Sequence, residues 1–532
     1  MEVDLLFRGA TVVDGTGGEP YPGDVAVAGD RIVAVGALSD VRATRVVDLA
    51  GRVLCPGFID IHTHSDVSLL LDPAGESKVR QGVTTEVTGN CGFSAFPLAP
   101  DRLDLHADHL ARIGDDPVPL TWTDLDGYAD RLAADPPALN VAPLVGHGTI
   151  RVAVMGVDQR RPTAAELDRM RALVADSLDR GAFGLSTGLT HIPSGYGDTD
   201  EVRALVEVVA SRDATYATHA RAECGPGFPD VEEAIATCRD TGARLQFSHA
   251  AINEPAKWGR AADVVALFER AAADGLDVWF DVYPYDASSS SLTQYLPPWT
   301  QAGGTEGMRR TLADPAARQR AERELAAGWM GGIPWYWDRV VISRSGPGRE
   351  DVVGLSIEEA AARAGVDPVA FTLDLCLEHG NAVQVVLFYR TEADMTTFLA
   401  HHRSVVGSDG SAVPLAQNGL KPHPRGFGTY PRVLGRYVRE QGVLSLPDAV
   451  RKMTGAVADR LRLPDRGRVR VGAFADLVAF DPATVRDVAT FTEPAQPPVG
   501  ISHVVVNGTL VVDDGTQTAA RPGRVLRRSV AR

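Results

Sequence analysis

Between about residues 55 and 460, short apolar segments alternate with alanine-rich segments of helical periodicity, such as 164–180 and 261–274. The apolar segments are strand candidates at 53–61, 84–88, 141–145, 184–187, 215–218, 245–247, 278–282 and 404–407. Strand–helix alternation over this length favours a parallel sheet with helices outside, so eight such strands predict an α/β fold of the (β/α)₈ TIM-like barrel type. A doubly wound open sheet is the alternative, although no glycine-rich phosphate loop follows the first strand.

The two chain ends differ in sequence pattern from this central part. Residues 1–54 and 461–532 contain short β-rich runs separated by Gly, Pro and Asp, which are typical turn residues. We expect both ends to form one small β-sandwich domain beside a catalytic barrel at 55–460. After the seventh strand candidate, residues 297–344 are too long and too rich in Trp, Gly and Arg for a simple loop. They predict an inserted subdomain over the barrel mouth, with an ordinary long helix as the alternative.

Charge and composition exclude several classes of partner. A net charge of −16 disfavours binding to nucleic acid or to an anionic membrane. No run approaches the roughly 18 apolar residues of a membrane span, and the N-terminal segment lacks the pattern of a signal peptide. Five cysteines without tight spacing suit a reducing compartment. We therefore expect a cytoplasmic protein with neither nucleic acid nor membrane as partner, whereas its oligomeric state stays unknown.

Side chains that can bind a metal follow five of the predicted strands: His62, His64, Cys91, His219, His249 and Asp409. The first two are two residues apart at a strand end, so they point the same way. In a barrel, the carboxyl ends of all strands meet at one face. The six side chains are therefore expected to converge on one site.

Each of these residues also has an ordinary structural interpretation. His219 and His249 could be buried histidines with satisfied hydrogen bonds. Cys91 could be a packed thiol, and Asp409 could be a turn residue that binds its own backbone. Their joint placement at one rim favours a metal site over these separate explanations.

The ligand types narrow the metal and its chemistry. One thiolate with two neutral imidazoles suits zinc in a tetrahedral site with an open fourth position. Such a metal lowers the pKa of bound water and polarises a carbonyl oxygen. A nearby carboxylate can move the proton of that water to a leaving amine. The set therefore predicts hydrolysis of an amide.

With these residues in view, the chain resembles the amidohydrolase superfamily and, within it, the N-acyl-D-amino-acid deacylases, also called D-aminoacylases. The resemblance covers nearly the whole chain. It rests on PGFIDIHTHSD at 56–66, GVTT at 82–85, GNCG at 89–92, GHG at 146–148, GLSTGL at 184–189, YPY at 283–285, GSDG at 407–410 and HPR at 423–425. The GNCG segment is specific to the deacylase branch.

The resemblance implies one tight zinc site, formed by Cys91, His219 and His249. It allows a second, weaker site formed by His62, His64 and Asp409, with Asp409 as the catalytic acid and base. Many members of the superfamily bridge two metals with a carbamylated lysine from the fourth strand. None of the four lysines of this chain lies in 184–189, so that bridge is not available.

The resemblance also implies contacts to the carboxylate end of the substrate, made by Arg425, Tyr283 and Ser290. Relatives tend to have Tyr at the position of His191, which we include among the substrate-binding candidates. They also have Lys two residues after the sixth-strand histidine, where this chain has Ala251. The missing lysine leaves the substrate specificity open, and Lys257 or a protonated His191 could replace its charge.

Together, these observations predict a zinc-dependent hydrolase that cleaves a linear amide, most simply of an N-acyl-D-amino acid or a related N-acyl compound. The alternative is a cyclic-amide hydrolase of the dihydroorotase or hydantoinase kind, which shares the barrel. A non-catalytic barrel subunit is less favoured, because a scaffold does not need Asp409 beside its metal. The sequence determines neither the acyl group nor the stereochemical preference, the number of working metals or the pathway.

Overall fold

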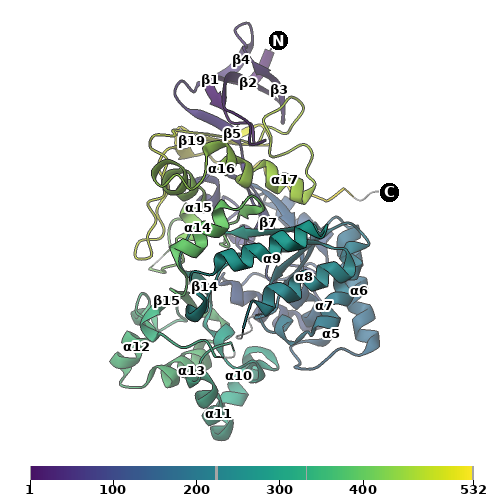
Figure 1. Cartoon of the computed structure of the whole chain (residues 1–532), viewed down its shortest axis with the longest axis vertical. Helices are drawn as coiled ribbons and strands as arrows, with labels where there is room; N and C mark the ends of the chain where they lie inside the picture. Colours follow the sequence, from purple (N-terminus) through teal and green to yellow (C-terminus); the bar gives the residue numbers. More distant parts are fainter. Residues whose placement is uncertain (1, 222–225, 331, 418, 530–532) are drawn as a thin grey trace.

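The computed structural model describes residues 2–221, 226–330, 332–417 and 419–529. Figure 1 shows three bodies in a row, with a β domain at the top, a barrel in the middle and a mainly helical body at the bottom. Among the described residues, none of the helices has both the length and the apolar character of a membrane span.

The middle body is built on two parallel ladders. The first ladder contains β6 (Phe58–Asp60), β7 (Val83–Thr88) and β8 (Asn140–Pro143). The second contains, in spatial order, β17 (Ser404–Val406), β13 (Val278–Val282), β12 (Arg244–Phe247), β11 (Thr215–His219), β10 (Gly184–Gly188) and β9 (Val145–Gly146).

The two ladders are joined at both ends, by continuity of the chain at one end and by hydrogen bonds at the other. On one side β8 and β9 are consecutive, and the intervening Leu144 donates its N–H to Thr88 O at 2.9 Å. On the other side Thr63 and Gly410 form a parallel bridge, and Asp409 N donates to His62 O at 2.8 Å. The parallel strands therefore close into a ring, which confirms the predicted barrel class and excludes the open sheet.

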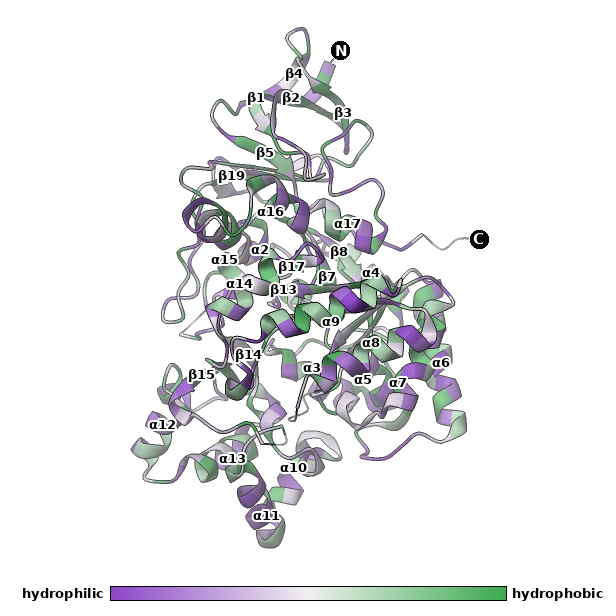
Figure 2. Cartoon of the chain, viewed as in Figure 1, coloured by the Kyte–Doolittle hydropathy of each residue, from purple (hydrophilic) through white to green (hydrophobic). Residues whose placement is uncertain are grey.

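Helices surround this ring on the outside (Figure 1). They include α6 (Ala164–Asp179), α7 (Thr199–Ala210), α8 (Pro229–Thr241), α9 (Ala261–Ala273), α14 (Glu392–Ala400) and α16 (Leu446–Met453). Hydrophilic and hydrophobic residues alternate along several of them in Figure 2. This is the pattern of amphipathic helices whose apolar side packs on the strands.

Both chain ends contribute to one nine-stranded sheet. Its strands are β1 (Glu2–Val12), β2 (Tyr21–Ala28), β3 (Arg31–Gly36), β4 (Arg42–Asp48), β5 (Val53–Pro56), β18 (Leu477–Phe480), β19 (Ile501–Val506), β20 (Thr509–Asp513) and β21 (Thr516–Gln517). The order is β21-β20-β19-β18-β5-β1-β2-β3, with β4 on β1. The N-terminal and C-terminal halves meet where β5 pairs with β18 in antiparallel register. The small β domain is therefore formed from both ends, as predicted.

One predicted strand, residues 53–61, is wrong as a single element. The chain breaks at Gly57, so that β5 joins the terminal sheet and β6 joins the barrel. A Cβ at Gly57 would lie 2.2 Å from Thr84 Oγ1, which shows how closely the backbone passes β7 there. Both strands are buried, so the apolar run continues across the break and the sequence shows no boundary there.

The third body has its own sheet and core. An antiparallel sheet orders β14 (Ser288–Ser291), β16 (Gln384–Leu387) and β15 (Val340–Arg344), and the helices are α10 (Gly304–Ala313), α11 (Pro315–Ala326), α12 (Ile357–Ala364) and α13 (Pro368–His379). Its separate apolar cluster runs from Leu292 to Tyr389. The body therefore extends beyond the predicted insertion at 297–344 and is not one long helix.

A buried lysine crosslinks the barrel below its carboxyl-end face. Lys78 lies in α2 (Glu76–Val79), and its Nζ lies 2.9 Å from Asp60 Oδ2 and 3.0 Å from Glu86 Oε1. The same ammonium group donates to Ser408 Oγ at 2.6 Å and to Gly410 O at 2.9 Å. Burial lowers the pKa of Lys78, but the two carboxylates raise it above its ordinary value, so the group is charged.

Replacing Lys78 with Met should leave two buried carboxylates without their cation. We expect a loss of about 3–5 kcal/mol, the usual cost of removing one partner of a buried ion pair. Urea unfolding followed by circular dichroism measures it, with Lys421→Met at a partly exposed lysine as the matched control. The control should stay within about 0.5 kcal/mol of wild type. Equal stability of the two variants would show that the Lys78 charge is dispensable.

Candidate metal centre

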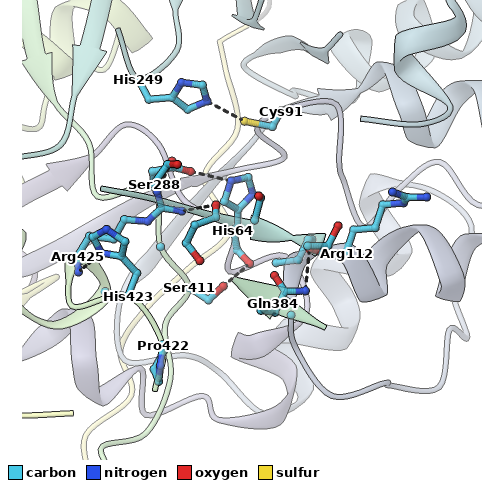
Figure 3. A pocket seen from close by; sticks show the side chains of 18 of the residues that line it. His64, Cys91, Arg112, His249, Ser288, Gln384, Ser411, Pro422, His423 and Arg425 are labelled. Atoms are coloured by element: carbon cyan, nitrogen blue, oxygen red, sulfur yellow. Dashed lines mark hydrogen bonds and ion pairs between the residues drawn. The ribbon is translucent and has the colours of Figure 1, made fainter. Parts of the chain in front are cut away.

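The structure brings all six predicted metal-binding side chains to the carboxyl-end face of the barrel. Cys91 Sγ lies 3.2 Å from His62 Nε2 and 3.5 Å from His249 Nε2. His249 Nε2 lies in turn 2.9 Å from His219 Nδ1. Figure 3 shows His249 and Cys91 facing each other at the edge of the cavity. The candidate ligands therefore converge although they come from several different strands.

The side chains form two groups that share Cys91. The ligand atoms of His62, His64, Cys91 and Asp409 all lie within 4.8 Å of one another. Within this group, Asp409 Oδ1 lies 3.0 Å from His64 Nε2 and 3.4 Å from His62 Nε2. On its other side, Cys91 faces His219 and His249. This arrangement places one thiol between two sets of nitrogen and oxygen donors.

His191 also reaches the metal-binding group. Its ligand atom, with those of Cys91 and His219, forms a second set within 4.8 Å. The ring packs against Phe93, with centroids 5.0 Å apart, and against His219 at 4.7 Å. Burial lowers the pKa of His191 to about 4, so the ring is neutral near pH 7. His191 therefore lies beside the thiol and supplies no positive charge to the cavity.

Charge interactions set the protonation states at the centre. Burial alone raises the pKa of the Cys91 thiol, but the charge of His62 and hydrogen bonds from the other histidines hold it well below its ordinary value. Burial likewise raises the pKa of Asp409, whereas the Arg425 charge and the two nearby histidines hold it well below the normal range. A thiolate and a carboxylate are thus favoured, and both are metal-binding forms.

These residues fit a zinc ion. Two ligand atoms at about 2.0–2.3 Å from a tetrahedral zinc are roughly 3.3–3.6 Å apart, close to the 3.5 Å between Cys91 Sγ and His249 Nε2. Sulfur with imidazole nitrogen is the borderline-soft donor set that zinc prefers. In addition, the buried His64 Nδ1 has no hydrogen-bond partner among the described residues. The donor chemistry and the Cys91–His249 spacing therefore agree with zinc, whereas the 2.9 Å between His249 Nε2 and His219 Nδ1 is shorter than the separation of two zinc ligands would be.

Two residues that contact the candidate ligands were not predicted from the sequence. Asp281 Oδ1 lies 3.1 Å from His62 Nδ1 and also accepts a hydrogen bond from His249 N at 2.8 Å. Thr190 Oγ1 lies 2.7 Å from His219 Nε2. Contacts of this kind fix ring orientation and tautomer in metal sites. An acidic residue inside the apolar run 278–282 could have identified Asp281 from the sequence. No sequence pattern distinguishes Thr190.

Three of the converging residues have left-handed backbone conformations. The φ angles are 53° at Cys91, 37° at His249 and 53° at Asp409. Such conformations cost non-glycine residues about 1–3 kcal/mol and cluster at functional sites. Next to Cys91, a Cβ at Gly188 would lie 1.9 Å from the Cys91 carbonyl oxygen, so glycine is required there. The local backbone is therefore shaped to present these side chains.

The centre opens into a cavity of about 510 Å³ between the barrel face and the third body. The predicted substrate residues Arg425, Tyr283 and Ser290 line it, as does Ala251. Arg425 Nη1 donates to Asp409 Oδ2 at 2.7 Å, and Ser290 Oγ lies 2.7 Å from Tyr295 OH. Figure 3 shows Arg425 and His64 at this cavity. A small molecule entering the cavity would contact the metal-binding residues and Arg425 together.

Comparison with known proteins agrees with this geometry. The sequence profile of the amidohydrolase family matches residues 45–314 and 356–512. The chain is 38% identical over 531 residues to an N-acyl-D-glutamate deacylase of Alcaligenes xylosoxydans xylosoxydans, covering 100% of this chain and 98% of the relative. It is 36% identical to a D-aminoacylase of the same organism, covering 99% and 98%.

A solved structure is similar along its whole length. The N-acyl-D-glutamate deacylase of Bordetella bronchiseptica, crystallised with zinc and a phosphonate inhibitor that mimics the tetrahedral intermediate, superposes with a TM-score of 0.84. The two chains are 34% identical, and the match covers 99% of this chain and 100% of the other. Together with the closed barrel and the converging ligands, these matches show that the chain belongs to the amidohydrolase family.

Proposed function

We propose that this protein is a zinc-dependent hydrolase of a linear amide, with an N-acyl-D-amino acid or a related N-acyl compound as substrate. Cys91, His219 and His249 would hold one tight zinc ion. His62, His64 and Asp409 would form a weaker second position. The observation that carries the proposal is the meeting of these six side chains beside a cavity that is also lined by Arg425 and Tyr283.

Zinc held at this centre supplies a more acidic water and a polarised carbonyl oxygen. Asp409 would handle the proton of the attacking water, and its carboxylate within 3.4 Å of both His62 and His64 supports this role. It takes one proton as the oxygen–carbon bond forms and gives it to the amine nitrogen as the carbon–nitrogen bond breaks. The Arg425 contact at 2.7 Å and the buried histidines keep the carboxylate ionised before the reaction.

The cavity residues favour a substrate with an anionic group near the scissile amide. The Arg425 guanidinium centre lies 4.7 Å from the Tyr283 ring centroid, so cation and ring form one surface. The Tyr283 hydroxyl is buried and has no hydrogen-bond partner among the described residues. A carboxylate can accept hydrogen bonds from both groups. This arrangement fits an N-acyl amino acid better than a neutral cyclic amide.

A substrate panel tests the proposal. Purified protein is incubated with N-acetyl and N-formyl derivatives of D- and L-amino acids, and with hydantoin and dihydroorotate, before and after treatment with a zinc chelator. We expect release of free D-amino acid, loss of this activity with chelator and recovery when zinc is added back. Turnover of the cyclic amides alone would establish the alternative reaction instead. No hydrolysis of any compound by the zinc-loaded protein would contradict the proposal.

Asp409→Asn should remove proton transfer while leaving the thiolate and imidazole ligands in place. We expect kcat to fall by about 10²–10⁴-fold, the usual contribution of a general acid and base. Zinc content measured on the same preparation separates this effect from loss of metal, and Asp487→Asn at a carboxylate paired with Arg432, outside the cavity, serves as the matched control. An Asp409→Asn variant with full zinc and normal kcat would rule out the assigned role.

A further inference from the structure

The cavity wall beside the metal centre lacks a cation where β12 ends. After His249, the chain passes through Ala251, whose small side chain lines the cavity. A void of about 10 Å³, close to the space of one water, lies between Ala251, Tyr283 and Arg390. Lys257, the nearest lysine along the chain, is ion-paired with Glu254 at 2.8 Å and does not line the cavity.

Arg390 reaches this place from the opposite side. It follows β16 in the segment that returns from the third body to the barrel, and its side chain lines the cavity. Arg390 Nε donates to Asn253 Oδ1 at 2.9 Å, and its guanidinium centre lies 4.6 Å from the Tyr283 ring centroid. Because Arg425 lies 4.7 Å from the same centroid, two guanidinium groups border one tyrosine.

The bonding of Arg390 differs from that of the other cavity arginines. Arg425 is bound to Asp409, and Arg344 is bound to Asp116 and to the Gly114 carbonyl. The two terminal nitrogens of Arg112 donate hydrogen bonds to the uncharged side chains of Thr293 and Gln301. Within the described part of the chain, Arg390 has no acidic partner, and its terminal nitrogens form no hydrogen bond.

Among the described residues, two donor groups at this place lack an acceptor: the terminal nitrogens of Arg390 and the Tyr283 hydroxyl. The Tyr283 hydroxyl is buried and unpaired among the described residues, and burial raises its pKa, so it keeps its proton. The terminal nitrogens of Arg390 can form a planar fork of donors. The acceptor that satisfies both groups has two oxygens and a negative charge, which describes a carboxylate.

We propose that Arg390 binds a carboxylate of the substrate and thereby helps to set the specificity of this hydrolase. The inference rests on the proposed function. Its physical advantage is that Arg390 can bind the substrate without withdrawing Arg425 from Asp409, so that binding leaves the acid and base group in place. The carboxylate is either the α-carboxylate of the amino acid or an acidic side chain, and the experiment separates these two sources.

The test measures how Arg390→Met changes discrimination between charged and neutral substrates. One pair is the best substrate of the panel and its α-carboxamide, and the other is N-acetyl-D-glutamate and N-acetyl-D-glutamine. A compound that is not hydrolysed is measured as a competitive inhibitor. We expect kcat/KM for the charged member of one pair to fall about tenfold or more, mainly through KM, as for loss of a charge-assisted hydrogen bond.

The neutral member of that pair should change by less than about threefold, because it makes no charged contact with Arg390. A response of the first pair assigns the α-carboxylate, and a response of the second assigns the side chain. Equal losses for charged and neutral compounds, or no change in either pair, would overturn the proposal. A zinc-loaded wild type that hydrolyses nothing would instead refute the proposed function.

Three further variants control for structural effects. Arg344→Met removes a cavity arginine that already has an acidic partner, so it should leave both ratios near wild type. Arg390→Lys keeps the charge and should keep most of the preference, even if Arg390→Met folds poorly. Ala251→Lys combined with Arg390→Met returns a cation from the opposite wall and should restore at least part of the lost discrimination. Failure of both charge-bearing variants to differ from Arg390→Met would also contradict the proposal.

Discussion

The site depends on the place where the barrel ring closes. Asp409 N donates to His62 O, and the neighbouring Thr63–Gly410 bridge joins the first barrel strand to the last. These contacts bring Asp409 within hydrogen-bonding distance of His64, although the two residues are 345 positions apart in the chain. Directly below, the Lys78 ammonium group holds Asp60, Glu86 and Ser408 together. A charge network in the barrel interior therefore fixes the geometry of the catalytic face.

Local backbone strain and close packing add to this preorganisation. Cys91, His249 and Asp409 all have positive φ, and the carbonyl oxygen of Cys91 occupies the space that a Cβ at position 188 would need. Behind the imidazoles, Asp281 holds His62 and the backbone of His249, while Thr190 holds His219. A metal bound by the proposed ligands would then cost little side-chain entropy, because these contacts already hold the side chains. The energy of folding thus positions the candidate ligands.

Sequence patterns predicted the barrel and the converging ligands because both depend on strand ends. A strand that ends in His-x-His points both rings to one side, and parallel strands present their carboxyl ends together. The division of residues 53–61 into β5 and β6 was not predictable from hydropathy, since burial continues through Gly57. The position of Arg390 beside Tyr283 was also not predictable, because it depends on how the chain returns from the third body to the barrel. Long-range contacts of this kind produce no periodic pattern in the sequence.

We propose that one thiolate and two imidazoles hold the tight zinc ion. X-ray absorption at the zinc edge of protein loaded with one zinc equivalent tests it most directly. The account predicts one sulfur neighbour at about 2.3 Å and two imidazole nitrogens at about 2.0–2.1 Å, with the sulfur signal and most of the zinc lost in Cys91→Ala. A first shell of nitrogen and oxygen alone, or full zinc occupancy in Cys91→Ala, would contradict it.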